Sequence, residues 1–211
     1  MQLPINRQIS SWITPWLAFF QLTPNQVTLL SLGAGFLSAW NFFQGMPRTW
    51  LLGAVWLEIA YVLDNCDGEL ARLTGTSSGL CSWLDTITDC LIHMTFFLCL
   101  GFGLYRFHSN PLWIHLGWIS AGGVFLTYVT FILDQIRQRG KEALIHPDPP
   151  SGEGPPGLLG KVRKVFREDF SLVVLGSALL GHVAWLLWGG VFGAFIYWIS
   201  NTVVLATREW R

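Results

Sequence analysis

Apolar residues gather in six runs along the 211-residue chain, and polar or basic residues separate the runs. A helix that spans a membrane takes roughly 20 consecutive apolar residues. The runs lie at 26–43, 50–63, 80–105, 112–133, 170–187 and 191–206. The second run continues with helical periodicity past residue 63. The pattern predicts an all-α, polytopic membrane protein with six transmembrane helices.

The composition agrees with this interpretation. Hydrophobic residues make up 52% of the chain and charged residues 12%, with a mean hydropathy of +0.44. An average soluble domain has about a quarter of its residues charged. We therefore expect a single membrane-embedded domain over residues 1–211.

Two segments have the pattern of helices that lie on the membrane surface. Within 1–22, apolar residues recur every three or four positions between polar ones, which predicts an N-terminal interfacial amphipathic helix. Residues 158–167 mix apolar and basic side chains in the same way. Directly before the second segment, residues 140–157 contain five prolines and several glycines, which predicts a flexible loop.

The basic residues are distributed unevenly between the two predicted membrane faces. With six spans, eleven of the thirteen Lys and Arg residues fall on the side that holds both termini. Cytoplasmic flanks collect Lys and Arg, so this pattern predicts a multi-pass integral membrane protein with both termini, the loop 140–157 and the segment around Asp64–Asp89 facing the cytoplasm. A basic face suits membrane lipids and phosphate-bearing substrates, and we expect no nucleic-acid partner.

Four aspartates stand out in this apolar chain. Asp64 and Asp67 lie one turn apart at the end of the second predicted helix, and Asp85 and Asp89 lie one turn apart in the next. Antiparallel packing of the two helices would bring all four carboxylates together. Hard oxygen ligands without a histidine or thiolate favour Mg²⁺, Mn²⁺ or Ca²⁺. The alternative is a solvated charged loop between two spans.

Small residues accompany the first two aspartates. Gly68 and Ala71 share a helix face with Asp64, so a flat or phosphate group could approach the backbone there. Arg72 follows, and its guanidinium can bind phosphate oxygens in a bidentate manner. The pattern indicates a metal site next to a phosphate site.

The segment from Asp64 to Asp89 resembles the signature of the CDP-alcohol phosphotransferase family, D-x2-D-G-x2-A-R-x8-G-x3-D-x3-D. Seven of its eight fixed positions match, and Cys81 replaces a glycine. The resemblance implies that Asp64, Asp67 and Asp85 hold two metal ions, Mg²⁺ or Mn²⁺. It also implies that Asp89 is the general base and a further ligand.

The same resemblance implies the donor site and the partners. Gly68, Ala71, Arg72 and Ser78 would contact the CDP portion of a CDP-alcohol donor, and Asn25 and Thr28 would help to hold the nucleotide. A small polar alcohol would accept the phosphate-bearing group, with release of CMP. The residues around Asp64 resemble members that join inositol phosphates, while glycerol phosphate and serine stay open. A homodimer is expected, because the family commonly forms one.

Arginines on the predicted cytoplasmic side are candidates for holding a phosphate on the acceptor. They are Arg137, Arg163, Arg167 and Arg208. Glu58 lies within the second predicted span and is either a pocket residue or a partner for a neighbouring helix. His93 and His182, on apolar helices, are expected to be hydrogen-bonded packing residues.

Two other functions remain open at this point. A membrane prenyltransferase also binds a diphosphate through aspartates, and Asp85 to Asp89 fits one half of its motif. However, prenyltransferases of this type look longer than this chain, with more spans and with their two motifs far apart. A non-enzymatic divalent-cation transporter would also place carboxylates near glycines in a membrane. Arg72 argues against the transporter, because its charge repels cations.

Overall fold

The computed structural model describes residues 5–75, 79–139 and 170–193. Within these ranges the chain forms helices and turns and contains no strand, which confirms the predicted all-α class. The helices are α1 (Ile5–Phe19), α2 (Pro24–Phe43), α3 (Pro47–Thr74), α4 (Gly79–His108), α5 (Leu112–Arg139), α8 (Phe170–Leu179) and a further apolar helix at Ala184–Gly193.

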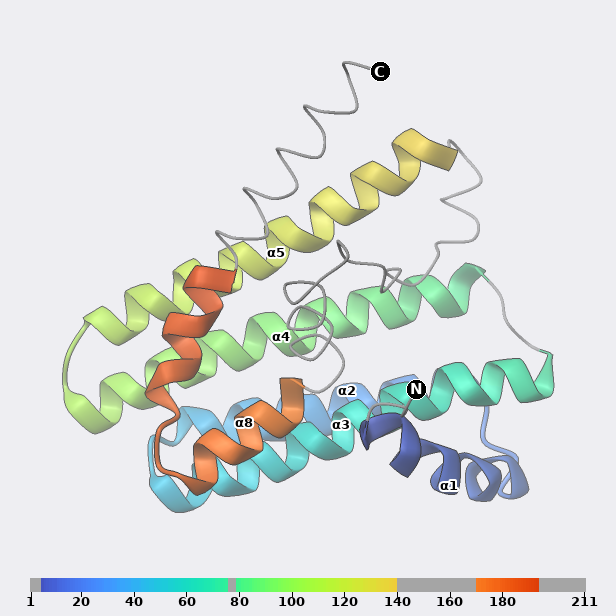
Figure 1. The fold of residues 1–211 in the computed structure, drawn as a ribbon, viewed down its shortest axis with the longest axis horizontal. Coiled ribbons are helices and arrows are strands. Elements are labelled where there is room, and N and C mark those ends of the chain that lie inside the picture. The colour runs from blue at the N-terminus through green and yellow to red at the C-terminus, as the bar shows by residue number, and fades with distance from the viewer. Residues whose placement is uncertain (1–4, 76–78, 140–169, 194–211) are drawn as a thin grey trace.

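The arrangement of the helices places the predicted site at one end of the molecule. Helix α3 ends and α4 begins at this end, so the two run in opposite directions (Figure 1). Helix α2 packs against both of them, α5 packs against α4, and α1 and α8 pack against α3. Among the described helices, α3 and α4 are not one of the closely packed pairs. Side chains of α3 and α4 contact each other across the gap, as Tyr61 and His93 do. We had expected the two helices to pack closely against each other.

Local sequence explains where the helices begin and end. Thr23 caps α2, since its hydroxyl accepts from the Gln26 N–H while the Gln26 side chain accepts from the Thr23 N–H. Helix α3 continues without a break from the apolar run through Asp64 and Asp67 to Thr74, as the periodicity predicted. It ends at Gly75, whose φ of 65° is left-handed. Asp64 and Asp67 therefore lie in the last turns of one continuous helix.

Glycines allow close contact at the helix crossings. A Cβ on Gly103 of α4 would collide with the Phe42 carbonyl oxygen of α2. A Cβ on Gly101 would lie 2.8 Å from the Trp113 carbonyl oxygen of α5. These contacts hold α2 and α5 tightly against α4, around a core that includes Phe42, Phe96 and Leu100.

Two helices in the described part are long and apolar enough to cross a membrane, judged by length and composition. They are Trp83–His108 within α4 and Leu112–Leu133 within α5, and they match the third and fourth predicted spans. The count of six spans stays a prediction. The loop 140–157, the segment 158–167 and residues 194–206 of the sixth run lie outside the described residues.

The fifth predicted span, 170–187, is wrong as a single helix. Helix α8 ends at Leu179, and a turn precedes the next helix at Ala184. Gly181 has a left-handed φ of 71°, the Gly181 N–H donates to the Ala178 carbonyl, and the His182 N–H donates to the Ser177 carbonyl. This Schellman arrangement terminates α8 even though apolar residues surround it.

Helix α1 packs against the protein through three buried polar residues together with the partly buried Ile13, Leu17 and Ala18. Asn6, Ser10 and Thr14 are buried, whereas Trp12 and Trp16 are 81% and 65% exposed. A helix in water would bury the tryptophans. The exposure of these two tryptophans supports the expectation that the outward side of α1 meets lipid.

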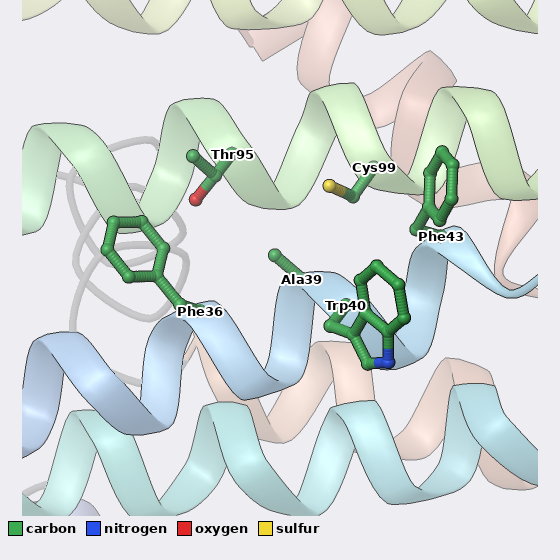
Figure 2. A pocket seen from close by; sticks show the side chains of 6 residues that line it. All are labelled: Phe36, Ala39, Trp40, Phe43, Thr95 and Cys99. Atoms are coloured by element: carbon green, nitrogen blue, oxygen red, sulfur yellow. The ribbon is translucent and has the colours of Figure 1, made fainter.

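The outer surface of α2 is also apolar. Leu30, Leu37 and Trp40 are exposed there. Next to them, a shallow groove of about 280 Å³ lies between α2 and α4 (Figure 2). It is lined by Phe36, Ala39, Trp40, Phe43, Thr95 and Cys99. This surface suits contact with lipid acyl chains better than contact with water.

Candidate active site

Three of the predicted aspartates converge where α3 and α4 face each other. Each of Asp64, Asp67 and Asp85 offers a carboxylate oxygen within 4.8 Å of those of the other two. Asp67 is 5% exposed, and Asp64 and Asp85 are half-buried. Asp64 and Asp67 come from successive turns of α3, and Asp85 comes from the first turns of α4. Helix geometry thus produces a compact group of oxygen atoms.

The charges of this group are not balanced by cationic side chains alone. Burial and the nearby Asp85 raise the pKa of Asp67, which lies four residues past the apolar run 50–63, to about 7. The Thr28 hydroxyl, the Gly68 N–H and Arg72 act in the opposite direction. Burial, followed by Asp89 and Asp85, also raises the pKa of Asp64. A divalent cation would remove this repulsion.

The donor set fits a hard divalent ion. The convergent atoms are carboxylate oxygens within 4.8 Å of one another, close enough to share a cation. Within the described part, the buried Oδ1 atom of Asp64 has no hydrogen-bond partner. A buried oxygen without a partner is costly, and a bound ion would satisfy it.

Asp89 lies next to this group but outside it. It is among the strongest electrostatic neighbours of Asp64, yet it is not one of the three aspartates that converge. Its main-chain carbonyl accepts a hydrogen bond from His93 one turn further along α4. The position of Asp89 therefore differs from that of the other three aspartates.

The first turn of α2 reaches the same place. The Thr28 hydroxyl donates to Oδ2 of Asp67, and Thr28 is itself buried. Asn25, one turn earlier, is half-buried. The expected nucleotide-binding residue Thr28 thus contacts a carboxylate of the metal group directly.

The small face of α3 lies beside Asp67, as expected. A Cβ on Gly68 would be 3.5 Å from Nη1 of Arg72, so the guanidinium extends over the glycine. Arg72 is exposed and Ala71 is buried. A cation and an open stretch of backbone next to a carboxylate group form a suitable cradle for a phosphate.

Several predicted residues lie outside the described part of the chain. Ser78, Arg163, Arg167 and Arg208 belong to this set, and so do the side chains of Cys81 and Arg137. Their roles stay predictions.

The structure adds residues that the sequence did not single out. Glu69 accepts hydrogen bonds of 2.7 Å from the hydroxyls of Ser10 and Thr14, which fixes α1 against the turn of α3 that bears Asp67. The four-residue spacing of Asn6, Ser10 and Thr14 is the signal that could have revealed this contact. Asn6 donates in turn to Ser171 of α8.

His93 is a hydrogen-bonded packing residue, as expected, whereas the same expectation is wrong for His182. Both ring nitrogens of His93 are hydrogen-bonded, to Tyr61 and to the Asp89 carbonyl. His182 lies exposed in the turn after α8, where its Nδ1 contacts the Leu180 carbonyl. The direct link from His93 to Tyr61 of α3 was not expected.

In their described part, the fold and the site define an all-helical protein with two helices apolar enough to cross a membrane and three convergent carboxylates that could hold a divalent metal ion. The sequence model of the CDP-alcohol phosphatidyltransferase family matches residues 21–195. The chain belongs to this family.

Curated relatives include two proteins called bifunctional IPC transferase and DIPP synthase. The protein from Aquifex aeolicus is 32% identical over 129 residues, which is 60% of this chain and 28% of the relative. The protein from Thermococcus kodakarensis is 29% identical over 127 residues, with the same shares. Bovine cholinephosphotransferase 1 is 30% identical over 127 residues, 56% of this chain and 30% of the relative. The matched part thus spans less than a third of each of these relatives.

Proposed function

We propose that the protein transfers a substituted phosphate group from a CDP-alcohol to a hydroxyl of a polar alcohol and releases CMP. The convergence of Asp64, Asp67 and Asp85 beside Gly68 and Arg72 is the observation that carries this proposal. The names of the relatives, an IPC transferase and a cholinephosphotransferase, support the same reaction class.

Asp64, Asp67 and Asp85 would hold two divalent ions, Mg²⁺ or Mn²⁺. When bound, such ions stabilise the negative charge on the diphosphate during the displacement. Arg72 binds the phosphate oxygens of the donor, and Gly68 leaves room for them against the backbone. Thr28 holds Asp67 in place through its hydroxyl.

Asp89 acts as the general base. It takes the proton from the acceptor hydroxyl while the acceptor oxygen forms a bond to the phosphorus that carries the donor alcohol. The bond from this phosphorus to the bridging oxygen breaks, and CMP leaves with the electron pair. The Asp89 carboxylate lies beside the group of Asp64, Asp67 and Asp85, and this position suits a base.

The finer assignments belong to the same proposal. The acceptor is a polar alcohol, for which an inositol phosphate is the first candidate. The protein crosses the membrane several times with the site facing the cytoplasm, and it functions as a homodimer. The exposed apolar surfaces of α1 and α2 support a membrane location.

The test uses the purified full chain in lipid nanodiscs. It is incubated with CDP-diacylglycerol or CDP-inositol, a panel of polar alcohols and Mg²⁺, and CMP and the product mass are measured. We expect CMP release that EDTA abolishes and that Asp64→Asn lacks. Release of inorganic diphosphate from a prenyl donor, or ion uptake into vesicles without CMP, would contradict the proposal in favour of a prenyltransferase or a transporter.

A further inference from the structure

A polar link between α3 and α4 lies one helical turn from the carboxylates. Tyr61 is three residues before Asp64 on α3, and His93 is four residues after Asp89 on α4. The Tyr61 hydroxyl is 2.6 Å from Nε2 of His93. Nδ1 of His93 is 2.7 Å from the Asp89 carbonyl oxygen. The link therefore runs from α3 to the main chain of Asp89.

The partners fix the proton positions along this link. A carbonyl oxygen can only accept, so Nδ1 of His93 carries the hydrogen and donates it to Asp89. Nε2 of the neutral ring is then an acceptor, and the Tyr61 hydroxyl donates to it. The order of donation is Tyr61 to His93 to the Asp89 carbonyl, and each bond has a defined direction.

Aromatic rings from two further helices enclose the link. The ring of Phe170 in α8 is 5.9 Å from the His93 ring and 6.4 Å from the Tyr61 ring, centroid to centroid. The ring of Tyr128 in α5 is 6.4 Å from the His93 ring. Hydrogen bonds among such apolar neighbours are strong and directional, and an unmatched polar group there would be costly.

The link matters because α3 and α4 are not a closely packed pair among the described helices. Contacts through α2 alone would allow α4 to slide or rotate relative to α3. Such a motion would shift Asp89 relative to Asp64 and Asp67. The Tyr61–His93 pair resists it directly, at the turn next to the carboxylates.

We propose that Tyr61 and His93 are positioning residues that set the place of Asp89 relative to the metal-binding carboxylates of α3. This inference rests on the proposed function. The pair touches neither substrate nor ion; it holds the base where the acceptor hydroxyl must lie. The predicted CDP-binding residues Gly68 and Arg72 both lie on α3, so the nucleotide site does not depend on it.

The test compares Tyr61→Phe and His93→Phe with the wild-type chain in nanodiscs. Misplacement of a catalytic group by about 1 Å lowers the rate by roughly 100-fold. We expect kcat to fall by about 10- to 100-fold in each variant, with the KM for the CDP-alcohol changed less than about 2-fold. The double variant should be no slower than the slower single variant, because each substitution already breaks the same Tyr61–His93 hydrogen bond.

Two matched variants separate positioning from packing. Tyr105→Phe removes the hydroxyl of an exposed tyrosine at the other end of α4 and should keep wild-type kcat. His93→Asn keeps a donor at the position of Nδ1 and should recover part of the rate lost in His93→Phe. Unchanged kcat in Tyr61→Phe, or a rise in the KM for the CDP-alcohol as large as the fall in kcat, would overturn the inference. A wild-type chain that releases no CMP would instead overturn the proposed function, and the inference with it.

Discussion

The Thr28 hydroxyl donates a hydrogen bond to Oδ2 of Asp67 and joins the first turn of α2 to the ligand-bearing turn of α3, 39 residues further along the chain. Residues behind a metal ligand orient it, and their loss typically weakens metal affinity by about 10- to 100-fold. We therefore predict that Thr28→Val lowers Mn²⁺ affinity by about 10-fold in isothermal titration calorimetry. Thr28→Ser keeps the hydroxyl and should retain the affinity. Equal affinities in both variants would show that Thr28 does not orient Asp67.

Asp85 and Asp89 lie one turn apart on α4 and allow a matched comparison. Asp85 belongs to the convergent group, whereas Asp89 lies beside it. We predict that Asp85→Asn abolishes both Mn²⁺ binding and CMP release. Asp89→Asn should abolish CMP release and leave CDP binding largely intact, because the amide cannot take up the acceptor proton. Full activity of Asp89→Asn would remove the assignment of the base.

Arg72 is predicted to bind the donor through the geometry of its guanidinium as well as through its charge. Arg72→Lys keeps the charge but loses the paired donors, so the KM for the CDP-alcohol should rise by about 10-fold, and Arg72→Gln should raise it further. Arg106→Gln is the control, because Arg106 lies over the Phe43 ring at the far end of α4. A KM in Arg72→Lys equal to that of the wild type would exclude a bidentate contact.

The raised pKa of Asp67, about 7, predicts how the metal-free protein responds to pH. Between the ordinary value of 3.8 and about 7 the folded protein holds a proton that the unfolded chain has lost. Stability without metal should therefore decrease as the pH rises through this window and level off above about 7. Thermal unfolding in EDTA at pH 5 and pH 8 measures this, and Asp67→Asn should flatten the difference. A higher Tm at pH 8 than at pH 5 would contradict the expected direction.

Mn²⁺ should act in the opposite direction, because it competes with the proton for the same oxygens. Its affinity should increase as the pH rises toward about 7 and its stabilising effect should be largest above that value. The same unfolding experiment with Mn²⁺ in place of EDTA tests this. A stabilisation independent of pH would place the ion away from Asp67.

The sequence was sufficient to predict the features that depend on local spacing. The periodicity through Asp64 and Asp67 predicted a helix that continues past residue 63, and α3 does so to Thr74. The one-turn separations predicted that carboxylates from two helices would meet, and Asp64, Asp67 and Asp85 converge. Such features follow from helix geometry and need no knowledge of the tertiary packing.

The sequence was not sufficient where packing or a single turn residue decides. The apolar run 170–187 concealed a turn, because the left-handed Gly181 ends α8 without any polar neighbour before it. An amphipathic pattern in 1–22 does not say which residues face the protein, and in α1 the buried ones include Asn6, Ser10 and Thr14. The contacts of Thr28 with Asp67 and of Tyr61 with His93 join distant segments, and only the placement of α2 and α4 reveals them.

The exposed aromatic residues of α1 also affect how the protein must be handled. Ser10 and Thr14 tie this helix to Glu69, two residues from Asp67, while Trp12, Trp16, Phe19 and Phe20 point outward. If the amphiphile around the protein were removed, these aromatic rings would meet water or one another. Detergent or lipid must therefore cover this face of α1 throughout purification.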